Sequence, residues 1–235
     1  MKTAGIILTL LFGIWLSAGE TVRAVLFPFR EAVIAARVDS RLQPYNFRIG
    51  QAFKKDAVLA GLDKEKFQLE YTRSKSQYEF ALASFENKKR LRERNFTSDY
   101  ELKKAEFEMR MNKTAMEETA LALSYCDISA PFDGRIVEIM TREYEIVRPG
   151  QPLCRIIDDN FLLAVMNVPL SQKRLTSVGN KVEIKLDSGM VAAGEIYEVS
   201  PQADHRTGTV RIRVKIDNRD GRFTSGMTGE LHYGN

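Results

Sequence analysis

The stretch from Lys64 to Leu123 constrains the fold more than any other part of the chain. It is rich in Glu, Lys, Arg, Ala, Leu, Gln and Met and contains no Gly or Pro. These residues favour helix, and nothing in the stretch breaks one. Two stripes recur at spacings of three and four, as in a heptad pattern. The first is Phe67, Tyr71, Ser74, Tyr78, Ala81, Phe85 and Lys88, and the second is Leu102, Ala105, Met109, Asn112, Met116, Thr119 and Leu123.

The segment Arg94–Glu101, "RNFTSDYE", interrupts the register between the two stripes. Within it, Ser98 and Glu101 have the spacing of a capping box, which starts a new helix. We therefore expect two antiparallel helices of about 28 and 26 residues, each roughly 40 Å long. Polar residues such as Ser74 and Asn112 occupy stripe positions. This coiled-coil hairpin should therefore gain little stability from its seam and be locally mobile.

The hydrophobic period changes to two on both sides of the predicted hairpin. "RIGQAFKKDAVLAGLD", ending at Asp63, and "IVRPGQPLCRIIDD", starting at Ile146, each contain Gly-Gln, an apolar pair and an acid. This internal echo predicts one small β domain in two halves, residues 32–63 and 126–158, with a hairpin over 64–125 inserted between them. The returning helix must end at Ala-Pro-Phe-Asp-Gly, because Pro131 cannot continue it and Asp133-Gly134 favours a turn.

The final region, residues 159–235, has the pattern of a small β-barrel. Five β-prone runs are separated by turn signals such as Gly179-Asn180 and Asp220-Gly221, without alternating helices. One short helix is expected over residues 170–178. The predicted fold is thus mixed α+β and elongated: a split β domain, a helical hairpin and a barrel.

The first nineteen residues have the build of a secretory signal peptide. Lys2 precedes an apolar run from Ile6 to Leu16, and small residues follow at Ser17-Ala18-Gly19. We expect export with cleavage near Gly19, and an uncleaved inner-membrane anchor is the alternative.

Composition and motifs argue against several functional classes. The net charge of +4 is interspersed with acids, so nucleic-acid binding is not indicated. No nucleophile elbow, phosphate loop or paired carboxylates point to an enzyme. His205 and His232 lack further ligands at metal-binding spacing. The two cysteines, Cys126 and Cys154, are interpreted as buried small apolar side chains, although an exported chain would allow them to pair.

The order of these pieces resembles the periplasmic adaptor subunits of bacterial efflux pumps and secretion systems, the membrane fusion proteins (HlyD-like). Their lipoyl-like domain carries Ile-x-Ala-Pro-Phe-Asp-Gly and then Gly-x-Pro-Leu, matched here at 128–134 and 150–153. The first half is similar at Gly50 and at 58–63, and the barrel at 206–207 and 226–227, so the resemblance covers about residues 32–232.

This chain also departs from the family pattern. Asp56 stands where a second Gly is common. Members of the resistance-nodulation-division (RND) type usually continue into a membrane-proximal β domain, which we expect to be missing or reduced here. Lipoyl and biotin carriers present a modified Lys where this chain has the hairpin, so a carrier role and a cofactor are not expected.

The resemblance implies a non-enzymatic adaptor in the periplasm, associated with the inner membrane. It would link an inner-membrane transporter, RND or ABC, to a TolC-like outer-membrane channel for efflux of drugs or other small substrates. The resemblance also implies a homo-oligomeric ring.

The hairpin tip is the expected contact with the channel. Family members that dock to TolC-like channels carry an Arg at the tip, a Leu four residues later and a Ser seven after that. Leu91 and Ser98 match the Leu and the Ser, while Asn87 replaces the Arg and several cations flank it. The candidate docking residues are Lys88, Arg90, Leu91, Arg92, Arg94 and Ser98.

Three alternatives stay open. The cations could form only a solvated turn, as charge runs usually do. Met109, Met111 and Met116 could bind copper or silver through their thioethers in a metal-efflux adaptor, although two of them lie on the packing stripe. The chain could also be a coiled-coil scaffold that serves no pump.

Overall fold

The computed structural model describes residues 20–172, 175 and 177–233. The predicted signal segment, residues 1–19, and part of the short helix expected over 170–178 lie outside the described residues. The helices are α1 (Glu65–Glu93) and α2 (Asp99–Ser124). Strands are β1 (Glu20–Ala35), β2 (Ser40–Tyr45), β3 (Ala52–Phe53), β4 (Val58–Leu62), β5 (Asp127–Ser129), β6 (Gly134–Ile139), β7 (Ile146–Val147), β8 (Pro152–Pro169), β9 (Lys181–Leu186), β10 (Val191–Asp204), β11 (Thr209–Asp217) and β12 (Thr228–Tyr233).

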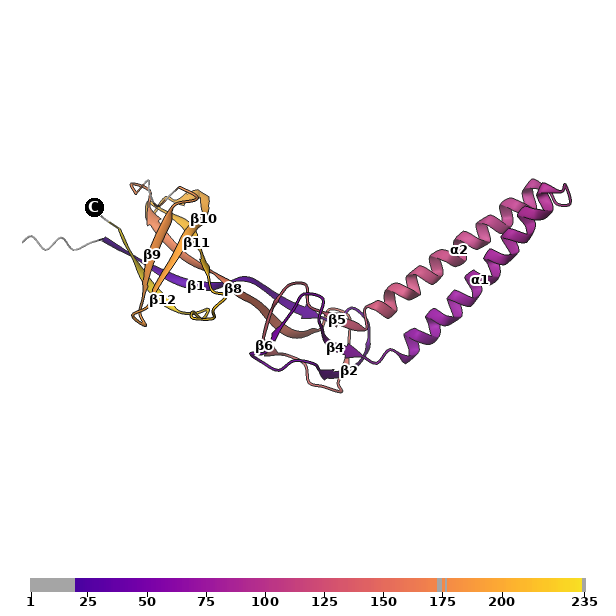
Figure 1. Cartoon of the computed structure of the whole chain (residues 1–235), viewed down its shortest axis with the longest axis horizontal. Coiled ribbons are helices and arrows are strands. Elements are labelled where there is room, and N and C mark those ends of the chain that lie inside the picture. The colour runs from indigo at the N-terminus through magenta and orange to yellow at the C-terminus, as the bar shows by residue number, and fades with distance from the viewer. Residues whose placement is uncertain (1–19, 173–174, 176, 234–235) are drawn as a thin grey trace, which may run out of the picture. The chain divides into compact units, whose positions relative to one another are not determined.

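The chain divides into two compact units. Unit 1 contains residues up to Phe27, then Leu162–Asn218 and the chain from Arg222, while unit 2 contains Pro28–Phe161 and Arg219–Gly221. Over the described residues, two helices and a sheet-rich remainder confirm the predicted mixture of helix and sheet (Figure 1). Neither helix combines the length and the apolarity that a membrane crossing requires.

Unit 2 is built around a sheet in the order β5-β4-β2-β7, with β3 and β6 paired beside it. Its side chains form two apolar clusters, one of which includes Cys126 and the other Cys154. Both cysteines are buried, free thiols. Phe67 from α1 and Leu123 from α2 pack on the first cluster, so the base of the helices is anchored in the β core.

The internal echo in the sequence corresponds to a repeated backbone turn. Gly50 and Gly150 both have a positive φ, of 82° and 85°. In each half the following glutamine accepts a backbone hydrogen bond from the arginine three residues before it: Arg48 N to Gln51 Oε1 at 3.0 Å, and Arg148 N to Gln151 Oε1 at 3.1 Å. Gly fits both turns because it lacks the Cβ that disfavours this conformation.

Two other turns of unit 2 place non-glycine residues at positive φ. Asp56, which stands where the family commonly has Gly, has φ 64°, and Tyr144 has φ 67°. Their backbone N–H groups donate across the two halves, Asp56 to Ala130 O and Tyr144 to Leu42 O, both at 2.8 Å. The departure at Asp56 therefore keeps the glycine-like backbone.

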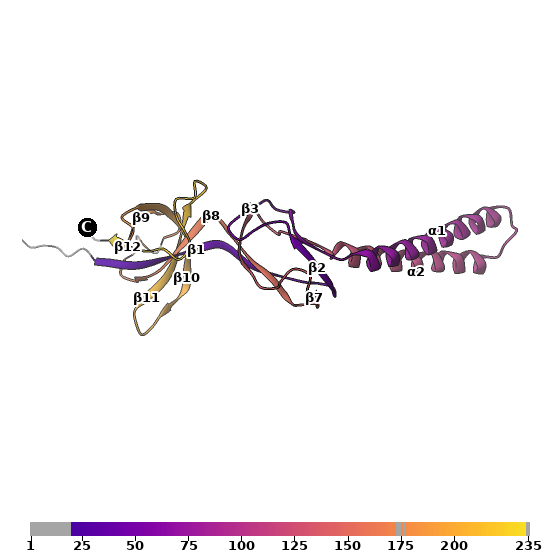
Figure 2. The ribbon, with the colours of Figure 1, turned by 90° about the horizontal axis from the view of Figure 1, so that it is seen from below.

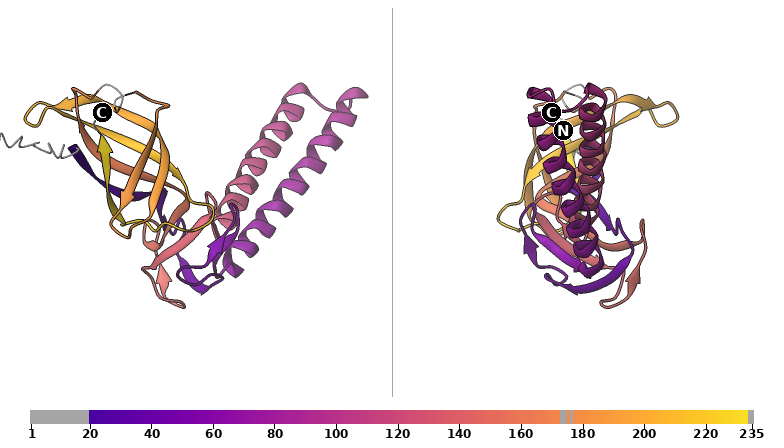
Figure 3. Two further views of the ribbon diagram at one scale, coloured as in Figure 1. Left: turned by 60° about the vertical axis from the view of Figure 1, so that its left-hand side comes forward. Right: turned by 90° about the vertical axis from the view of Figure 1, so that its right-hand side faces the viewer.

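The helices α1 and α2 lie side by side and run in opposite directions (Figures 1 and 3). Across the seam, the hydroxyls of Ser74 and Thr119 lie 2.6 Å apart near the base, and Lys88 pairs with Glu101 near the far end. Phe67, Ser74 and Ala81 of α1, spaced by seven, are buried together with Ala105 of α2. The predicted stripes thus face each other.

Unit 1 is a sheet that returns to its first strand. The order is β1-β12-β9-β10-β11-β8, and β8 also pairs with β1 (Figure 2). Alternate residues of these strands, such as Ile212, Val214 and Ile216, point into one apolar core. Five strands of this region were expected from the sequence, but no element was assigned to residues 20–31, where β1 lies.

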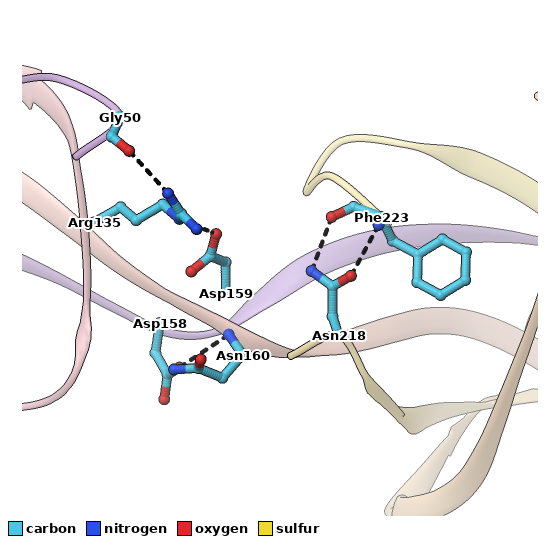
Figure 4. A network of polar contacts seen from close by, with 7 residues as sticks. All are labelled: Gly50, Arg135, Asp158, Asp159, Asn160, Asn218 and Phe223. Atoms are coloured by element: carbon cyan, nitrogen blue, oxygen red, sulfur yellow. Dashed lines mark hydrogen bonds and ion pairs between the residues drawn. The ribbon is translucent and has the colours of Figure 1, made fainter. Parts of the chain in front are cut away.

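Polar side chains bond to turn residues in each unit, and the one in unit 1 is buried while the one in unit 2 is exposed (Figure 4). In unit 1, the amide of Asn218 donates to Phe223 O and accepts from Phe223 N, both at 2.8 Å. In unit 2, Arg135 donates to Asp159 at 2.8 Å and to Gly50 O at 3.0 Å. These bonds satisfy backbone groups that a turn otherwise leaves exposed.

Candidate docking site at the hairpin tip

The tip is a defined turn that ends α1. Asn95 adopts positive φ, 61°, and its N–H donates to Arg92 O at 2.9 Å. The N–H of Phe96 donates to Leu91 O at 2.8 Å. This pair of bonds is a Schellman motif, and Asn is one of the few residues that tolerate its left-handed position. The turn therefore stops the helix directly after the cationic run.

Ser98 starts the second helix, as predicted. Its backbone is extended, and its side chain accepts a hydrogen bond from Glu101 N at 3.2 Å. The carboxylate of Glu101 accepts from Lys88 Nζ, also at 3.2 Å. The first bond satisfies an N–H group at the helix start, and the second ties α2 to the last turns of α1.

Arg92 spans the turn. Its Nε donates to Asp99 Oδ1 at 2.6 Å, and its Nη1 donates to Asn95 Oδ1 at 3.1 Å. The hydrogen bond from Arg92 is the main cause that holds the pKa of Asp99 below its usual range. Asp99 also lies in the first turn of α2, where a negative charge is favourable.

The structure gathers the predicted docking residues at the tip but separates them into two groups. Lys88 and Arg92 are held by carboxylates of α2, and Ser98 caps that helix. Arg90 and Arg94 are exposed, and Leu91 is half-buried. The first group shapes the turn, while the second is presented to solvent.

Two exposed aromatic residues at the tip escaped the sequence reasoning. Phe96 and Tyr100 are 76% and 74% exposed, more than Leu91. Both lie in the interrupted segment between the stripes, where an aromatic residue has no seam to fill. Their position between the two stripes was the sequence signal that could have identified them as exposed tip residues.

Ligands for a metal ion are not gathered in the part of the chain that the structure describes. There, no three His, Cys, Asp or Glu side chains form a group that could hold one. Of the three candidate methionines, Met111 is exposed on α2, while Met109 and Met116 are half-buried.

Two family models match separate parts of the chain. The model described as "RND MFP, barrel-sandwich hybrid domain" matches residues 30–159, and that described as "CusB-like, beta-barrel domain" matches residues 164–235. The first alone covers more than half of the chain, and the second coincides with most of the strands of unit 1.

Curated relatives match at low identity over most of the chain. The nodulation protein NolF of Rhizobium meliloti (strain 1021) is 25% identical over 86% of the chain and 59% of NolF. The multidrug resistance protein MdtA of Yersinia pestis (strain Pestoides F) is 23% identical over 80% of the chain and 48% of MdtA. The chain therefore spans less than two thirds of the length of these relatives.

Solved structures share the fold. A MacA-MexA chimera containing the Pseudomonas aeruginosa MexA alpha-hairpin domain superposes with a TM-score of 0.79 at 17% identity, over 92% of this chain and 82% of the chimera. The membrane fusion protein Spr0693 of Streptococcus pneumoniae R6 gives a TM-score of 0.72 at 13% identity, over 92% of this chain and 99% of Spr0693.

Proposed function

The chain belongs to the RND membrane fusion protein family, and from this premise we propose that it is a non-enzymatic periplasmic adaptor of an efflux pump. It links an inner-membrane transporter to a TolC-like outer-membrane channel and exports drugs or other small substrates. The matched model is that of RND adaptors, which favours an RND transporter over an ABC transporter. Several copies form a ring associated with the inner membrane, and the coiled-coil hairpin provides the channel contact.

The observation that carries this proposal is the built turn at the end of the hairpin. A solvated charge run needs no defined geometry, yet here Asn95, Ser98 and two cross-helix ion pairs fix the turn. With Lys88 and Arg92 occupied, Arg90 and Arg94 remain exposed to steer the tip toward an acidic channel mouth. Leu91 supplies apolar contact once the tip is seated.

Channel binding at low and high salt tests the proposal. Arg90→Glu combined with Arg94→Glu should weaken binding to a purified TolC-like channel most at low salt, where screening is least. Lys75→Glu combined with Lys113→Glu makes the same charge change away from the tip and should leave binding unchanged. Leu91→Asp should abolish export while the helical circular dichroism stays at the wild-type level.

Two results would count against tip docking. One is normal channel binding by both the tip charge variant and Leu91→Asp. The other is an equal loss with the control pair, which would mean that the net charge of the hairpin matters and not the tip.

A further inference from the structure

The hairpin tip carries the whole net charge of the chain. Residues 88–104, which comprise the end of α1, the turn and the start of α2, contain seven Lys or Arg and three Asp or Glu, a net charge of +4. The full sequence has 35 basic and 31 acidic residues, also +4, so the remaining residues are balanced at 28 of each. The attraction of this protein for an anionic surface is therefore concentrated at the tip.

Ion pairs occupy two of the three acids of the tip. Glu101 pairs with Lys88 at 3.2 Å, and Asp99 pairs with Arg92 at 2.6 Å, while Glu93 is exposed. Five other basic residues of the tip are exposed, namely Lys89, Arg90, Arg94, Lys103 and Lys104. The turn is thus surrounded by cations that solvent, or a surface, can reach.

Phe96 is exposed in the middle of this cationic turn. It follows Asn95 in the Schellman motif that ends α1, and its N–H donates to Leu91 O at 2.8 Å. A residue in this position commonly packs its side chain near the residue that supplies that carbonyl. Phe96 is nevertheless 76% exposed, so such a contact covers only a small part of it. Closing the end of the helix therefore does not account for a phenylalanine at this position.

The charge around Phe96 distinguishes it from other exposed aromatic residues of the hairpin. Phe80 is 79% exposed but directly follows Glu79, and Phe107, 64% exposed, lies between two glutamates. Single exposed aromatic residues of that kind are ordinary. Phe96 instead follows the exposed Arg94 by two residues. An exposed ring and a cluster of cations coincide at the turn.

Tyr100 adds a second exposed ring in the first turn of α2. It is 74% exposed, and the exposed Lys104 lies one helical turn further along. A tyrosine has an apolar body and a polar hydroxyl, which suit the boundary between water and an apolar phase.

The turn can approach such a boundary because its own hydrogen bonds are made. The N–H groups of Asn95 and Phe96 bond to carbonyls of α1, and Ser98 accepts from the N–H of Glu101. A backbone donor that enters an apolar region without a partner is costly, and these three donors have partners within the tip.

We propose that the hairpin tip binds an anionic phospholipid surface. Phe96 inserts below the headgroups, Tyr100 lies at headgroup level, and the exposed cations contact the phosphates. Aromatic residues at the interface and basic residues beside it are the two features that hold a protein segment at an anionic bilayer. A single small apolar anchor binds only marginally and salt screens the cations, so the contact is reversible and selective for anionic lipid.

The inference goes beyond the proposed function and does not rest on it, since lipid binding by the tip requires neither a channel nor a transporter. The same cations serve both contacts. A tip held at a membrane surface meets a membrane-embedded channel by diffusion in two dimensions, so lipid binding shortens its search.

A tryptophan at position 96 tests the insertion. The single tryptophan of the sequence, Trp15, is replaced by Phe so that each variant carries one reporter. We expect the emission of Phe96→Trp to shift to the blue with vesicles of equal parts phosphatidylcholine and phosphatidylglycerol, and to be quenched when the acyl chains are brominated. Vesicles of phosphatidylcholine alone should give little shift, and added salt should reverse the shift. Phe80→Trp, in the middle of α1, is the matched control and should not respond.

Charge variants in the Phe96→Trp background test the cations. Lys103→Glu combined with Lys104→Glu should raise the lipid concentration that gives half of the shift by about tenfold or more. Lys75→Glu combined with Lys113→Glu makes the same charge change away from the tip and should leave that concentration unchanged. Circular dichroism of each variant verifies that the helices are intact.

A reporter at position 100 tests the contribution of Phe96 itself. The emission of Tyr100→Trp should also shift with the anionic vesicles. Adding Phe96→Ala should raise the lipid concentration for half of that shift by about tenfold, because the ring is the inserted anchor. Adding Phe80→Ala, the same exchange at an equally exposed position, should have no effect.

The proposal is overturned if the emission of Phe96→Trp does not change with anionic vesicles, or if Phe80→Trp shifts as much. It is equally overturned if Phe96→Trp responds only to a purified TolC-like channel, which would assign the aromatic residues to a protein contact. A tip that inserts into vesicles but does not bind the channel would contradict the proposed function and support this inference.

Discussion

The side-chain oxygens of Ser74 and Thr119 lie 2.6 Å apart across the seam of the hairpin, and either hydroxyl can donate to the other. The hydroxyl that accepts across the seam keeps its own proton for a carbonyl of its helix, which is Tyr71 O at 3.0 Å for Ser74 or Met116 O at 2.9 Å for Thr119. A buried polar pair of this kind replaces the apolar contact that most helix seams use. The pair favours one axial register of the two helices, because the two hydroxyls meet only in that register.

Removal of one hydroxyl should expose the coupling between the two helices. Ser74→Ala should lower the free energy of unfolding of the hairpin by about 1 kcal/mol, since Thr119 loses a buried partner. In a Thr119→Val background the same change should cost less, and the difference measures the coupling. Thermal unfolding followed by the helical circular dichroism signal provides the values. Equal costs in both backgrounds would mean that the pair contributes nothing.

Loss of the cap should destabilise α2. Ser98→Ala removes the acceptor for Glu101 N and should cost about 1 kcal/mol. Ser76→Ala is the matched control, because this exposed serine lies inside α1 and alanine is the better helix former there. Urea unfolding of both variants measures the free energy of unfolding. If Ser76→Ala lowers it as much as Ser98→Ala does, the capping role is contradicted.

Glycine at position 144 should stabilise unit 2. Tyr144 is held at positive φ, which costs a non-glycine residue about 1–2 kcal/mol. Tyr144→Gly relieves this cost, but glycine loses more backbone entropy on folding. We therefore expect the free energy of unfolding to rise by up to about 1 kcal/mol. Gly150→Ala, at φ 85°, should be destabilising by a similar amount. A fall in the urea midpoint for Tyr144→Gly would show that its side chain makes compensating contacts.

Alkaline pH should destabilise unit 2 through Tyr45. Its hydroxyl donates to Leu153 O at 2.9 Å and to Thr141 O at 3.1 Å. Burial, with lesser effects of Cys154, Glu143 and Glu145, raises the pKa of Tyr45 above its ordinary value. The folded state therefore prefers the protonated form, and this stability is complete below about pH 10 and is lost as the pH rises further.

Tyr45→Phe should remove that part of the pH dependence and cost about 1 kcal/mol near neutral pH, because Thr141 O loses its hydroxyl donor while Leu153 O keeps the N–H of Met140. Burial also raises the pKa of Cys154 to about 11, so a smaller alkaline loss should persist in the variant. Urea unfolding at several pH values measures both effects. Tyr144→Phe, an exposed tyrosine, should keep the wild-type profile.

The parts of the fold that follow from local periodicity could be predicted, and those that depend on distant partners could not. The helices and the paired stripes follow from spacings of three and four, and the turn after Ser129 follows from Pro131 and Gly134. Strand β1 escaped prediction because its first residues adjoin the predicted signal segment and its pairing with β12 joins opposite ends of the chain.

The candidate site divides in the same way. Ser98 was predictable as a cap because its partner Glu101 is three residues away. The roles of Lys88 and Arg92 were not, since their carboxylate partners belong to the other helix. The positive φ of Asn95 could have been suspected from the residue type alone. The positive φ of Tyr144 could not, because bulky residues rarely adopt this conformation.

The hairpin leaves the β core from two strands that are already paired. Gly61 of β4 lies opposite Asp127 of β5, and Leu62 N donates to Cys126 O at 2.7 Å. The chain thus departs and returns one strand spacing apart, whatever lies between. Adding seven residues to each helix in register would carry the tip about 10 Å farther out without changing a single pairing in the sheet. The length of the hairpin can therefore be changed by insertions in the helices, while the β core that holds the hairpin stays the same.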